Sequence, residues 1–504
     1  MSNVMDYKMF IDGQWVDAHS GETMDVINPS NQEVVARVPK CGPLDIDRAV
    51  DAARSSFESG VWANKSKSER AHVLGQIALL LLKNTDRLAY LESLTSGACI
   101  RRTGFIDLGT AIMSFHTAAH LLDDMPEIEH ARRAPSAPLH SYTVREPIGV
   151  CAGIAPWNVP IMIASWKMAP CLAMGNSMVF KPASITPVTA LEIARLAKEA
   201  GLPDGVLNVV TGPGASAGSY LAGHPGVDKV SLTGSTEVGR DITHRAADTI
   251  KKVTLELGGK SPLIILDDAD MEVAINMGLL AFLYHQGQIC LSGTRLFVPR
   301  KMQDELVAGM VKRIKTLKIG NQMDPVSDQG PIANLQQLQT IMRYVEIGKQ
   351  EGAELVCGGN RLSGAEYDRG FFFEPTVFAN CTNQMTQARE EIFGPVQCVI
   401  PYDDVDEAIA MANDSPYGLA GGVVSTNVAR AQLLARKMRT GTVWINNYHF
   451  IRPDAPFGGY KQSGVGRECA FEGLYEYSEV KHICQDLTPE AKDKFWNPFL
   501  GFVY

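Results

Sequence analysis

One cysteine of the sequence stands where a nucleophile could work. Cys290 follows the polar stretch Gln-Gly-Gln at 286–288, which comes directly after the apolar helical segment 274–284. A glycine at the junction of a helix and a loop leaves room for another group to approach the thiol. A nucleophilic cysteine needs such access, a thiolate form and nearby hydrogen-bond donors. The alternative is a small buried apolar residue, the commonest role of a free cysteine.

Two further polar residues stand where a predicted strand ends. Glu256 lies between two leucines and precedes two glycines, and apolar neighbours raise a carboxyl pKa as a general base requires. Its alternative role is a helix N-cap or a solvent-facing strand edge. Asn158 ends the Pro-Trp-Asn stretch 156–158 and opens a helix, where its amide could hold an oxyanion. Its alternative role is an ordinary N-cap asparagine.

Two glycine-rich turns and one lysine suit a ligand that carries phosphate. The turns at 211–218 and 233–239 each follow a predicted strand and precede a helix, so their backbone N–H groups could hold a phosphate. Neither turn is the regular G-x-G-x-x-G dinucleotide fingerprint. Lys181 closes an apolar strand, from which it could reach a ribose or a phosphate. A surface lysine is the alternative.

Alternating strands and helices must position these residues. Five short apolar strands with helical segments between them predict a parallel sheet with crossover helices. The strands are 149–154, 177–181, 206–210, 229–232 and 253–257, and the helices lie near 160–174, 186–200, 215–222 and 236–248. A second alternating series from 262 to about 445 predicts a second α/β domain, with a ligand cleft between the two.

The first 122 residues are predicted to form a hairpin and then helices. Segments 7–11 and 14–16 flank Asp12 and Gly13, a strong hairpin-turn signal. Helical periodicity follows over 44–57, 71–94 and 106–122.

The composition is that of an ordinary globular protein with two or three domains. The chain has 504 residues, 45% apolar and 20% charged, which excludes disordered, collagen-like and coiled-coil chains. The net charge is −9, and the longest basic stretch, 312–318, has the spacing of a solvated helix face. We therefore expect no nucleic-acid partner.

Several features favour a cytoplasmic protein without a membrane segment. The ten cysteines form no CxxC pair, which is typical of a reducing compartment, and the first ten residues contain no apolar run. Segment 147–166 carries no charge and is long enough to span a bilayer. Its prolines and glycines instead favour a buried strand, a turn and a helix start. No cluster of histidines and cysteines has the spacing of metal ligands, so we expect no metal.

Seven motifs together resemble the NAD(P)-dependent aldehyde dehydrogenase superfamily. They occur in order with family-like spacing, and the similarity extends from about Phe10 to Lys481. The motifs are PWN 156–158, KPAS 181–184, TGSTEVG 233–239, LELGGKSP 255–262, GQIC 287–290, EEIFGPV 390–396 and PFGGYKQSG 456–464.

The resemblance implies an α/β fold with three parts. A Rossmann-like coenzyme-binding domain would comprise 1–125 and 148–257, and an α/β catalytic domain would comprise 258–462. A β-hairpin oligomerisation element at 126–147, with 463–504 as a further strand and C-terminal tail, would make the protein a homodimer or a dimer of dimers. The tail is aromatic and is expected to pack on its own body or on a neighbouring subunit; its aromatic residues are Phe495, Trp496, Phe499, Phe502 and Tyr504.

The resemblance also implies a role for each motif residue. Cys290 would be the nucleophile, Glu256 the general base, and Asn158 with the backbone N–H of Cys290 the oxyanion hole. The coenzyme, NAD or NADP, would contact Trp157, Lys181, Ser184, Gly234, Ser235, Leu257, Glu391 and Phe393. Cys290 would form a thiohemiacetal, hydride would pass to the nicotinamide, and water activated by Glu256 would release a carboxylic acid from the thioester. Relatives that transfer the acyl group to coenzyme A typically lack this glutamate, so a non-acylating enzyme is implied.

Ser184 bears on the choice between the two coenzymes. Members of the superfamily that prefer NAD often have glutamate at this position, which repels a 2′-phosphate. Serine removes that repulsion, and Lys181 could then pair with the phosphate. We therefore expect NADP to be tolerated beside NAD.

The residues that would line the substrate tunnel are apolar and include no arginine. They are Val159, Ile163, Trp166, Tyr284, Ile289, Leu291, Phe450, Ile451 and Phe457. This lining favours hydrophobic aromatic, terpenoid or aliphatic aldehydes, although each of these residues could instead belong to the core.

Three alternatives to that substrate and function stay open. A semialdehyde would need a cationic side chain to bind its free carboxylate. Asp454 stands where relatives that act on semialdehydes can have arginine, although Arg452 is nearby. A betaine-type aldehyde would need an aromatic cage around its quaternary ammonium group. Val159 stands where relatives that act on such aldehydes have an aromatic residue, which argues against this substrate. A non-catalytic coenzyme-binding or structural protein is the alternative of another class, and the presence of nucleophile, base and oxyanion donor argues against it.

Overall fold

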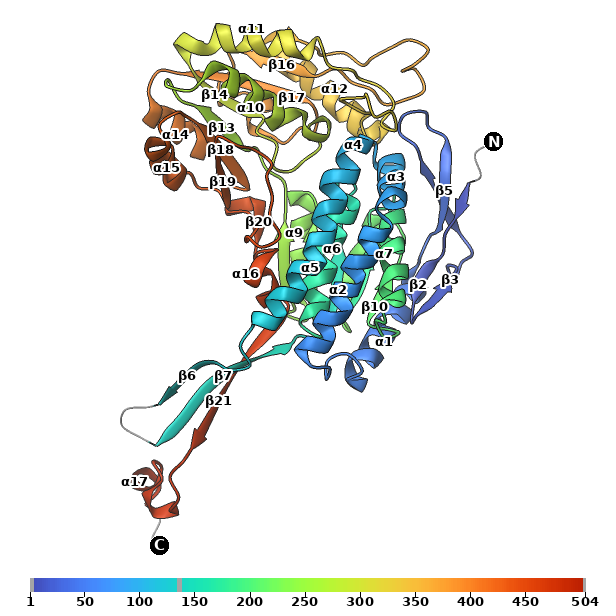
Figure 1. Cartoon of the computed structure of the whole chain (residues 1–504), viewed down its shortest axis with the longest axis vertical. Coiled ribbons are helices and arrows are strands. Elements are labelled where there is room, and N and C mark those ends of the chain that lie inside the picture. Colours follow the sequence, from blue (N-terminus) through green and yellow to red (C-terminus); the bar gives the residue numbers. More distant parts are fainter. Residues whose placement is uncertain (1–3, 134–137, 502–504) are drawn as a thin grey trace.

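The computed structural model describes residues 4–133 and 138–501, and two large sheets organise them (Figure 1). In the first sheet the five predicted strands are confirmed and all run parallel, in the order β12-β11-β8-β9-β10. Their bounds are β8 (Val150–Ile154), β9 (Ser177–Lys181), β10 (Leu207–Val209), β11 (Lys229–Thr233) and β12 (Lys252–Glu256). Because parallel strands end at one edge, Lys181, Thr233 and Glu256 come out on the same side of the sheet.

The crossover helices are also where the sequence predicts them. They are α6 (Pro160–Ala173), α7 (Val188–Glu199) and α9 (Thr236–Ala247). The predicted helix near 215–222 differs in that it is a single π turn, Gly214–Gly218, followed by the short α8 (Ser219–Gly223).

Three antiparallel strands extend the first sheet to eight. At one edge, β2 (Met9–Ile11) and β3 (Gln14–Val16) form the predicted hairpin, with φ of 52° at Asp12 and 70° at Gly13. Two successive positive φ angles define the turn type that matches strand twist. At the other edge, β20 (Gly464–Val465) pairs with β12 beside Glu256.

Helices from the first part of the chain cover this sheet. They are α1 (Pro43–Ser59), α2 (Lys67–Lys83), α3 (Thr85–Ser96), the short α4 (Ile100–Arg102), a π-helical turn (Thr103–Asp107) and α5 (Leu108–Asp124). The prediction of one helix over 71–94 is wrong, because the chain breaks at Asn84. The Asn84 side-chain amide donates to the carbonyl oxygen of Leu80 at 2.8 Å, and α3 starts at the next residue. α5 packs against both α2 and α6, and Figure 1 shows α5 running beside α2.

The second alternating series is confirmed as a seven-stranded sheet with a core of its own. Its order is β15-β16-β17-β14-β13-β18-β19, and only the edge strand β15 runs antiparallel. The strands are β13 (Pro262–Ile265), β14 (Arg295–Pro299), β15 (Glu354–Cys357), β16 (Thr376–Ala379), β17 (Val396–Tyr402), β18 (Ala420–Val424) and β19 (Thr442–Ile445). The main helices are α10 (Met271–Leu283), α11 (Gln303–Ile314), α12 (Leu335–Gln350), α14 (Val405–Asn413) and α15 (Val428–Lys437), with the short α13 (Thr386–Arg389). The short α16 (Ala470–Tyr475) packs instead against α5 and α6.

Two small sheets complete the fold. One joins β1 (Met5–Asp6), β4 (Thr23–Ile27) and β5 (Val34–Pro39). The other joins β6 (Glu129–Arg133), β7 (Leu139–Pro147) and β21 (Ser478–Asp486), and Figure 1 shows it projecting from the body. Beyond it lies α17 (Asn497–Leu500), where Phe495 and Phe499 are exposed; the predicted tail residues Phe502 and Tyr504 lie outside the described residues.

In the described part of the chain, no helix combines the length and the apolar character needed to cross a bilayer. The fold as a whole is the α/β architecture expected from the sequence, with two large sheets and a projecting three-stranded sheet.

Candidate active site

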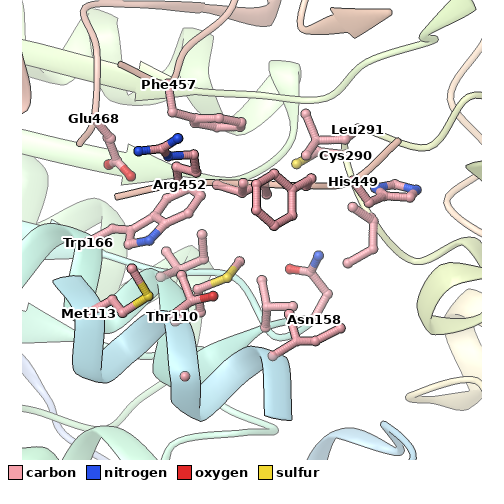
Figure 2. Close-up of a pocket in the computed structure, with 18 of the residues that line it drawn as sticks. Thr110, Met113, Asn158, Trp166, Cys290, Leu291, His449, Arg452, Phe457 and Glu468 are labelled. Carbon is pink, nitrogen blue, oxygen red and sulfur yellow. The ribbon is translucent and has the colours of Figure 1, made fainter. Parts of the chain in front are cut away.

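Two cavities meet at the three residues predicted to be catalytic. The larger has a volume of about 640 Å³ and the smaller about 480 Å³. Asn158, Glu256 and Cys290 line both cavities, and so does Thr233. Figure 2 shows Cys290 and Asn158 on facing walls of the larger cavity. A group bound in one cavity can therefore react with a group bound in the other at these side chains.

A strained turn presents Cys290. After α10, His285, Gln286 and Gly287 have φ of 52°, 54° and 69°, all left-handed. A Cβ at Gly287 would lie 2.1 Å from the carbonyl oxygen of Gly394, so only glycine fits there. Such strain is concentrated at functional sites, where the surrounding structure holds it. The turn carries the chain from α10 back into the junction of the cavities.

The pKa of the Cys290 thiol lies above its ordinary value. Burial is the main cause, and the carboxyl groups of Glu391 and Glu256 add to it. The thiolate is the reactive form. A base must therefore take the proton of Cys290 before it can attack.

Asn158 lies between the end of β8 and the start of α6. It is buried, and its amide Nδ2 donates to the carbonyl oxygen of Gln288 at 2.8 Å, two residues before the nucleophile. The amide therefore already points toward the cysteine turn. A small rotation would let it donate to an oxygen on a carbon bound to Cys290, as an oxyanion hole requires.

Glu256 ends β12 as a buried carboxyl group. Within residues 4–133 and 138–501, neither of its oxygens has a hydrogen-bond partner. Burial, followed by the nearby carboxylate of Glu468, raises its pKa well above the ordinary glutamate value. A carboxyl group with a raised pKa can take a proton near neutral pH, which is what a general base does.

An ion pair missed by the sequence reasoning lies beside Glu256. Lys167 Nζ is 2.5 Å from Glu468 Oε1 and 3.0 Å from Ser231 Oγ, and both charged side chains are buried. Lys167 carries the single charge of the otherwise apolar α6, and that signal could have found it. Glu468 follows an arginine in a loop and carried no such signal.

All nine residues predicted for the substrate tunnel line the larger cavity. Trp166 and Phe457 form a tilted pair with ring centroids 4.9 Å apart, and Tyr284 stacks on His449 at 4.8 Å. Sequence reasoning missed one wall, which consists of Phe105, Ile106, Gly109, Thr110 and Met113 from the π-helical turn and α5. Their spacing of three to four residues is that of one helix face, but it also fits a core-facing stripe.

Arg452 and Asp454 also reach the larger cavity. They form a two-pronged ion pair with distances of 2.8 and 2.5 Å, and both are largely exposed. Figure 2 shows Arg452 near Glu468 and Trp166. The guanidinium of Arg452 is already paired with Asp454. It is therefore poorly available to bind a carboxylate on a substrate.

All eight residues predicted for coenzyme contact line the smaller cavity. The cavity reaches the start of α9, where Ser235 is the N-cap, and backbone N–H groups at such a terminus bind phosphate. Trp157 and Phe393 meet edge to face at 5.3 Å, and Glu391 accepts a hydrogen bond from Gly259 N–H at 3.2 Å. Burial raises the pKa of Glu391 to about 7. A dinucleotide fits this set of groups.

Lys181 is buried, so the surface alternative is wrong for this residue. Its ammonium donates to the carbonyl oxygens of Pro182 and Gly212 at 2.9 and 3.1 Å, and burial lowers its pKa to about 8. Two of its three hydrogens are engaged by the backbone. Among the described residues, no group of three or more His, Cys, Asp or Glu side chains is placed to hold a metal ion.

Comparison with known proteins agrees with this geometry. The model of the "Aldehyde dehydrogenase family" matches residues 15–483. A betaine aldehyde dehydrogenase of Bacillus subtilis is 43% identical over 492 residues, covering 97% of this chain and all of that protein. The structure of betaine aldehyde dehydrogenase from Staphylococcus aureus in complex with NAD+ superposes with a TM-score of 0.94 at 40% identity, covering 97% of each chain. An aldehyde dehydrogenase variant from Bacillus cereus has a TM-score of 0.93 at 42% identity, covering 96% of this chain and 97% of that one.

The chain therefore belongs to the aldehyde dehydrogenase family. It is an NAD(P)-dependent aldehyde dehydrogenase, as the seven motifs led us to expect. The relatives from Bacillus subtilis and Staphylococcus aureus correspond to the betaine-type alternative rather than to the hydrophobic aldehydes first expected.

Proposed function

We propose that this dehydrogenase oxidises an aldehyde to a carboxylic acid at the junction of the two cavities, using Cys290, Asn158 and Glu256. The observation that carries this proposal is that these three residues line both cavities. The aldehyde occupies the larger cavity and the coenzyme the smaller. Trp157, Lys181, Ser184, Gly234, Ser235, Leu257, Glu391 and Phe393 contact the coenzyme.

The reaction follows from the protonation states of these residues. Glu256, whose pKa is raised, takes the proton of Cys290, and the thiolate attacks the aldehyde carbon. Asn158 and the backbone N–H of Cys290 hold the oxyanion that forms, and one such donor is worth about 3–4 kcal/mol of barrier. The bound nicotinamide supplies the hydride acceptor. A thioester on Cys290 remains. Glu256 then gives its proton to solvent and deprotonates the attacking water, and the acid and the Cys290 thiol are released.

We infer that the substrate is a betaine-type aldehyde with a trimethylammonium head. Aromatic side chains line the larger cavity, among them Trp166, Phe450 and Phe457. Aromatic faces attract a quaternary ammonium ion. The names of the relatives from Bacillus subtilis and Staphylococcus aureus support the same class.

An uncharged hydrophobic aldehyde is the second candidate. Exposed apolar side chains line the larger cavity, namely Phe105, Met113 and Phe450. These side chains, together with the buried Val159 in the same lining, favour an uncharged hydrophobic substrate. A carboxylated semialdehyde is disfavoured because Asp454 already pairs with Arg452.

A matched pair of substrates separates the two candidates. Betaine aldehyde and 3,3-dimethylbutanal have the same shape and differ by one charge, because a carbon replaces the nitrogen. We expect kcat/KM to be at least tenfold higher for betaine aldehyde, measured by nicotinamide absorbance with NAD and with NADP. An equal or higher value for 3,3-dimethylbutanal refutes the betaine assignment and supports the hydrophobic one. Absence of turnover with every aldehyde of a broad panel refutes the proposed chemistry.

We also propose that the chain assembles into a dimer or a tetramer in the cytoplasm. β21 is a nine-residue edge strand of the projecting sheet, and its Val480 is exposed. An exposed strand edge pairs readily with another chain. Light scattering gives the native mass, and a monomer of 54.8 kDa would refute the assembly.

A further inference from the structure

Glu92 is a fully buried carboxyl group that connects two helices of the active site. It lies in α3, is 0% exposed, and belongs to none of the sequence motifs. Its Oε1 accepts a hydrogen bond from the backbone N–H of Ile161 at 2.9 Å. Its Oε2 accepts one from the hydroxyl of Thr189 at 2.7 Å. Ile161 and Thr189 are the second residues of α6 and α7, so one side chain ties the first turns of both helices together.

The first turn of α6 depends on this contact. Its N-cap, Val159, makes no side-chain cap among the described residues, and Pro160 has no N–H. The N–H of Ile161 is therefore the first backbone donor of α6, and it has no acceptor within the helix. A helix whose first N–H groups lack a cap is less stable. Asn158 stands immediately before this turn, with its amide directed at the cysteine turn. Any shift of the turn moves the oxyanion donor relative to Cys290.

The first turn of α7 is placed in the same way. Its N-cap is Pro187, which likewise makes no side-chain cap in the described structure. The loop that leads into α7 follows Lys181, the last residue of β9, and carries Ser184; both side chains line the smaller cavity. Thr186 Oγ1 of that loop also lies 3.4 Å from the carbonyl oxygen of Trp157. The contact with Thr189 thus anchors the coenzyme loop to the same carboxyl group.

We propose that Glu92 is a positioning residue of the dehydrogenase, holding the Asn158 amide at its place opposite Cys290 through α6 and the coenzyme loop through α7. This inference rests on the oxyanion role proposed for Asn158. A displacement of about 1 Å at a reacting group can cost about 100-fold in rate. A side chain that contacts neither substrate nor coenzyme can therefore control the reaction.

Three substitutions separate the two contacts. Burial raises the pKa of Glu92 to about 8. A glutamine keeps Oε1 as the acceptor for the Ile161 N–H, and its amide can donate to the Thr189 hydroxyl, which then accepts. Glu92→Gln is the conservative control and should keep all rates within about twofold. Glu92→Asp is shorter by one methylene and cannot reach both partners. Thr189→Val removes only the contact to α7.

The test reaction is acyl transfer from p-nitrophenyl acetate to Cys290 in the absence of coenzyme. The thiolate attacks the ester carbonyl, a C–S bond forms, and p-nitrophenolate leaves, so the step needs the oxyanion donor but no nicotinamide. We expect Glu92→Asp to slow this transfer at least tenfold, while alkylation of Cys290 by iodoacetamide stays within about twofold. Alkylation builds no oxyanion and reports general damage to the site. Thr189→Val should keep acyl transfer and weaken NAD binding several-fold.

The outcomes distinguish this inference from the function on which it rests. Acyl transfer at the wild-type rate in Glu92→Asp overturns the inference, and so does an equal slowing of transfer and alkylation. If Glu92→Asp does not fold, Glu92→Met fills the same volume without an acceptor and should give the same tenfold loss. Asn158→Ala is measured in parallel. Normal transfer in Asn158→Ala refutes the oxyanion role itself, whereas slow transfer there with normal transfer in Glu92→Asp refutes only the role of Glu92.

Discussion

Replacing Lys167 by methionine should destabilise the protein strongly. Lys167 is 0% exposed, and its ammonium is 2.5 Å from Glu468 and 3.0 Å from Ser231. Methionine keeps most of the volume but leaves the Glu468 carboxylate buried without its cation. Removing one partner of a buried ion pair costs about 3–5 kcal/mol, whereas exposed pairs contribute about 0–1 kcal/mol. We therefore expect a loss of about 3–5 kcal/mol in the free energy of unfolding.

Urea unfolding followed by tryptophan fluorescence measures this loss, with all proteins at one subunit concentration because assembly shifts the midpoint. Arg452→Met is the matched control, since that side chain belongs to the exposed pair of the same cavity, and its midpoint should not move. The double variant Lys167→Met/Glu468→Leu removes both charges and should recover most of the loss. A loss below about 1 kcal/mol in Lys167→Met, or a double variant less stable than the single one, refutes the reasoning.

Further predictions concern proton transfer and backbone strain. Glu468→Gln removes the carboxylate that, after burial, raises the pKa of Glu256, so the pH at which thioester hydrolysis is half-maximal should fall in stopped-flow assays; an upward shift contradicts this. Because burial raises the pKa of Cys290, its alkylation by iodoacetamide should still be accelerating between pH 7 and 9, and a plateau below pH 8 contradicts this. Ala470 has a φ of 52°, so Ala470→Gly should raise the free energy of unfolding by about 1 kcal/mol in the urea assay, and a decrease contradicts this.

Much of the fold and of the candidate site could be predicted from local sequence. Strand ends and helix starts are encoded by short runs of residues, so the sequence alone predicts Lys181 and Glu256 at strand ends and Asn158 just before a helix. Cys290 was recognised from its turn. Because parallel strands end together, residues far apart in sequence could be expected at one edge.

The residues that support the site could not be predicted in this way. Glu92 lies on the helical stretch that was predicted as a single helix, and nothing near it in sequence indicates Ile161 or Thr189 as its partners. Glu468 joins Lys167 across 301 positions of the chain. Such contacts depend on how whole elements pack, which local periodicity does not specify.

The backbone partners of Lys181 could not be predicted for a related reason. Lys181 is predicted to reach a ribose or a phosphate, and the structure adds two backbone carbonyl groups around its ammonium. The Gly212 carbonyl belongs to a turn that follows another strand of the same sheet. A sequence pattern indicates that a charge lies at a strand end, but the neighbouring loops decide which groups it meets.

The most direct test of the proposed chemistry is the mass of the Cys290 peptide in Glu256→Gln. The variant is mixed with NAD and an aldehyde that the wild-type enzyme oxidises, then quenched and digested. Because both thiol activation and hydrolysis need the base, we predict that reduced coenzyme forms slowly, reaches at most one equivalent per subunit and then stops, with the acyl group of the substrate on Cys290. Continued turnover with an unmodified Cys290, or normal turnover in Cys290→Ala, would contradict a thioester on this residue.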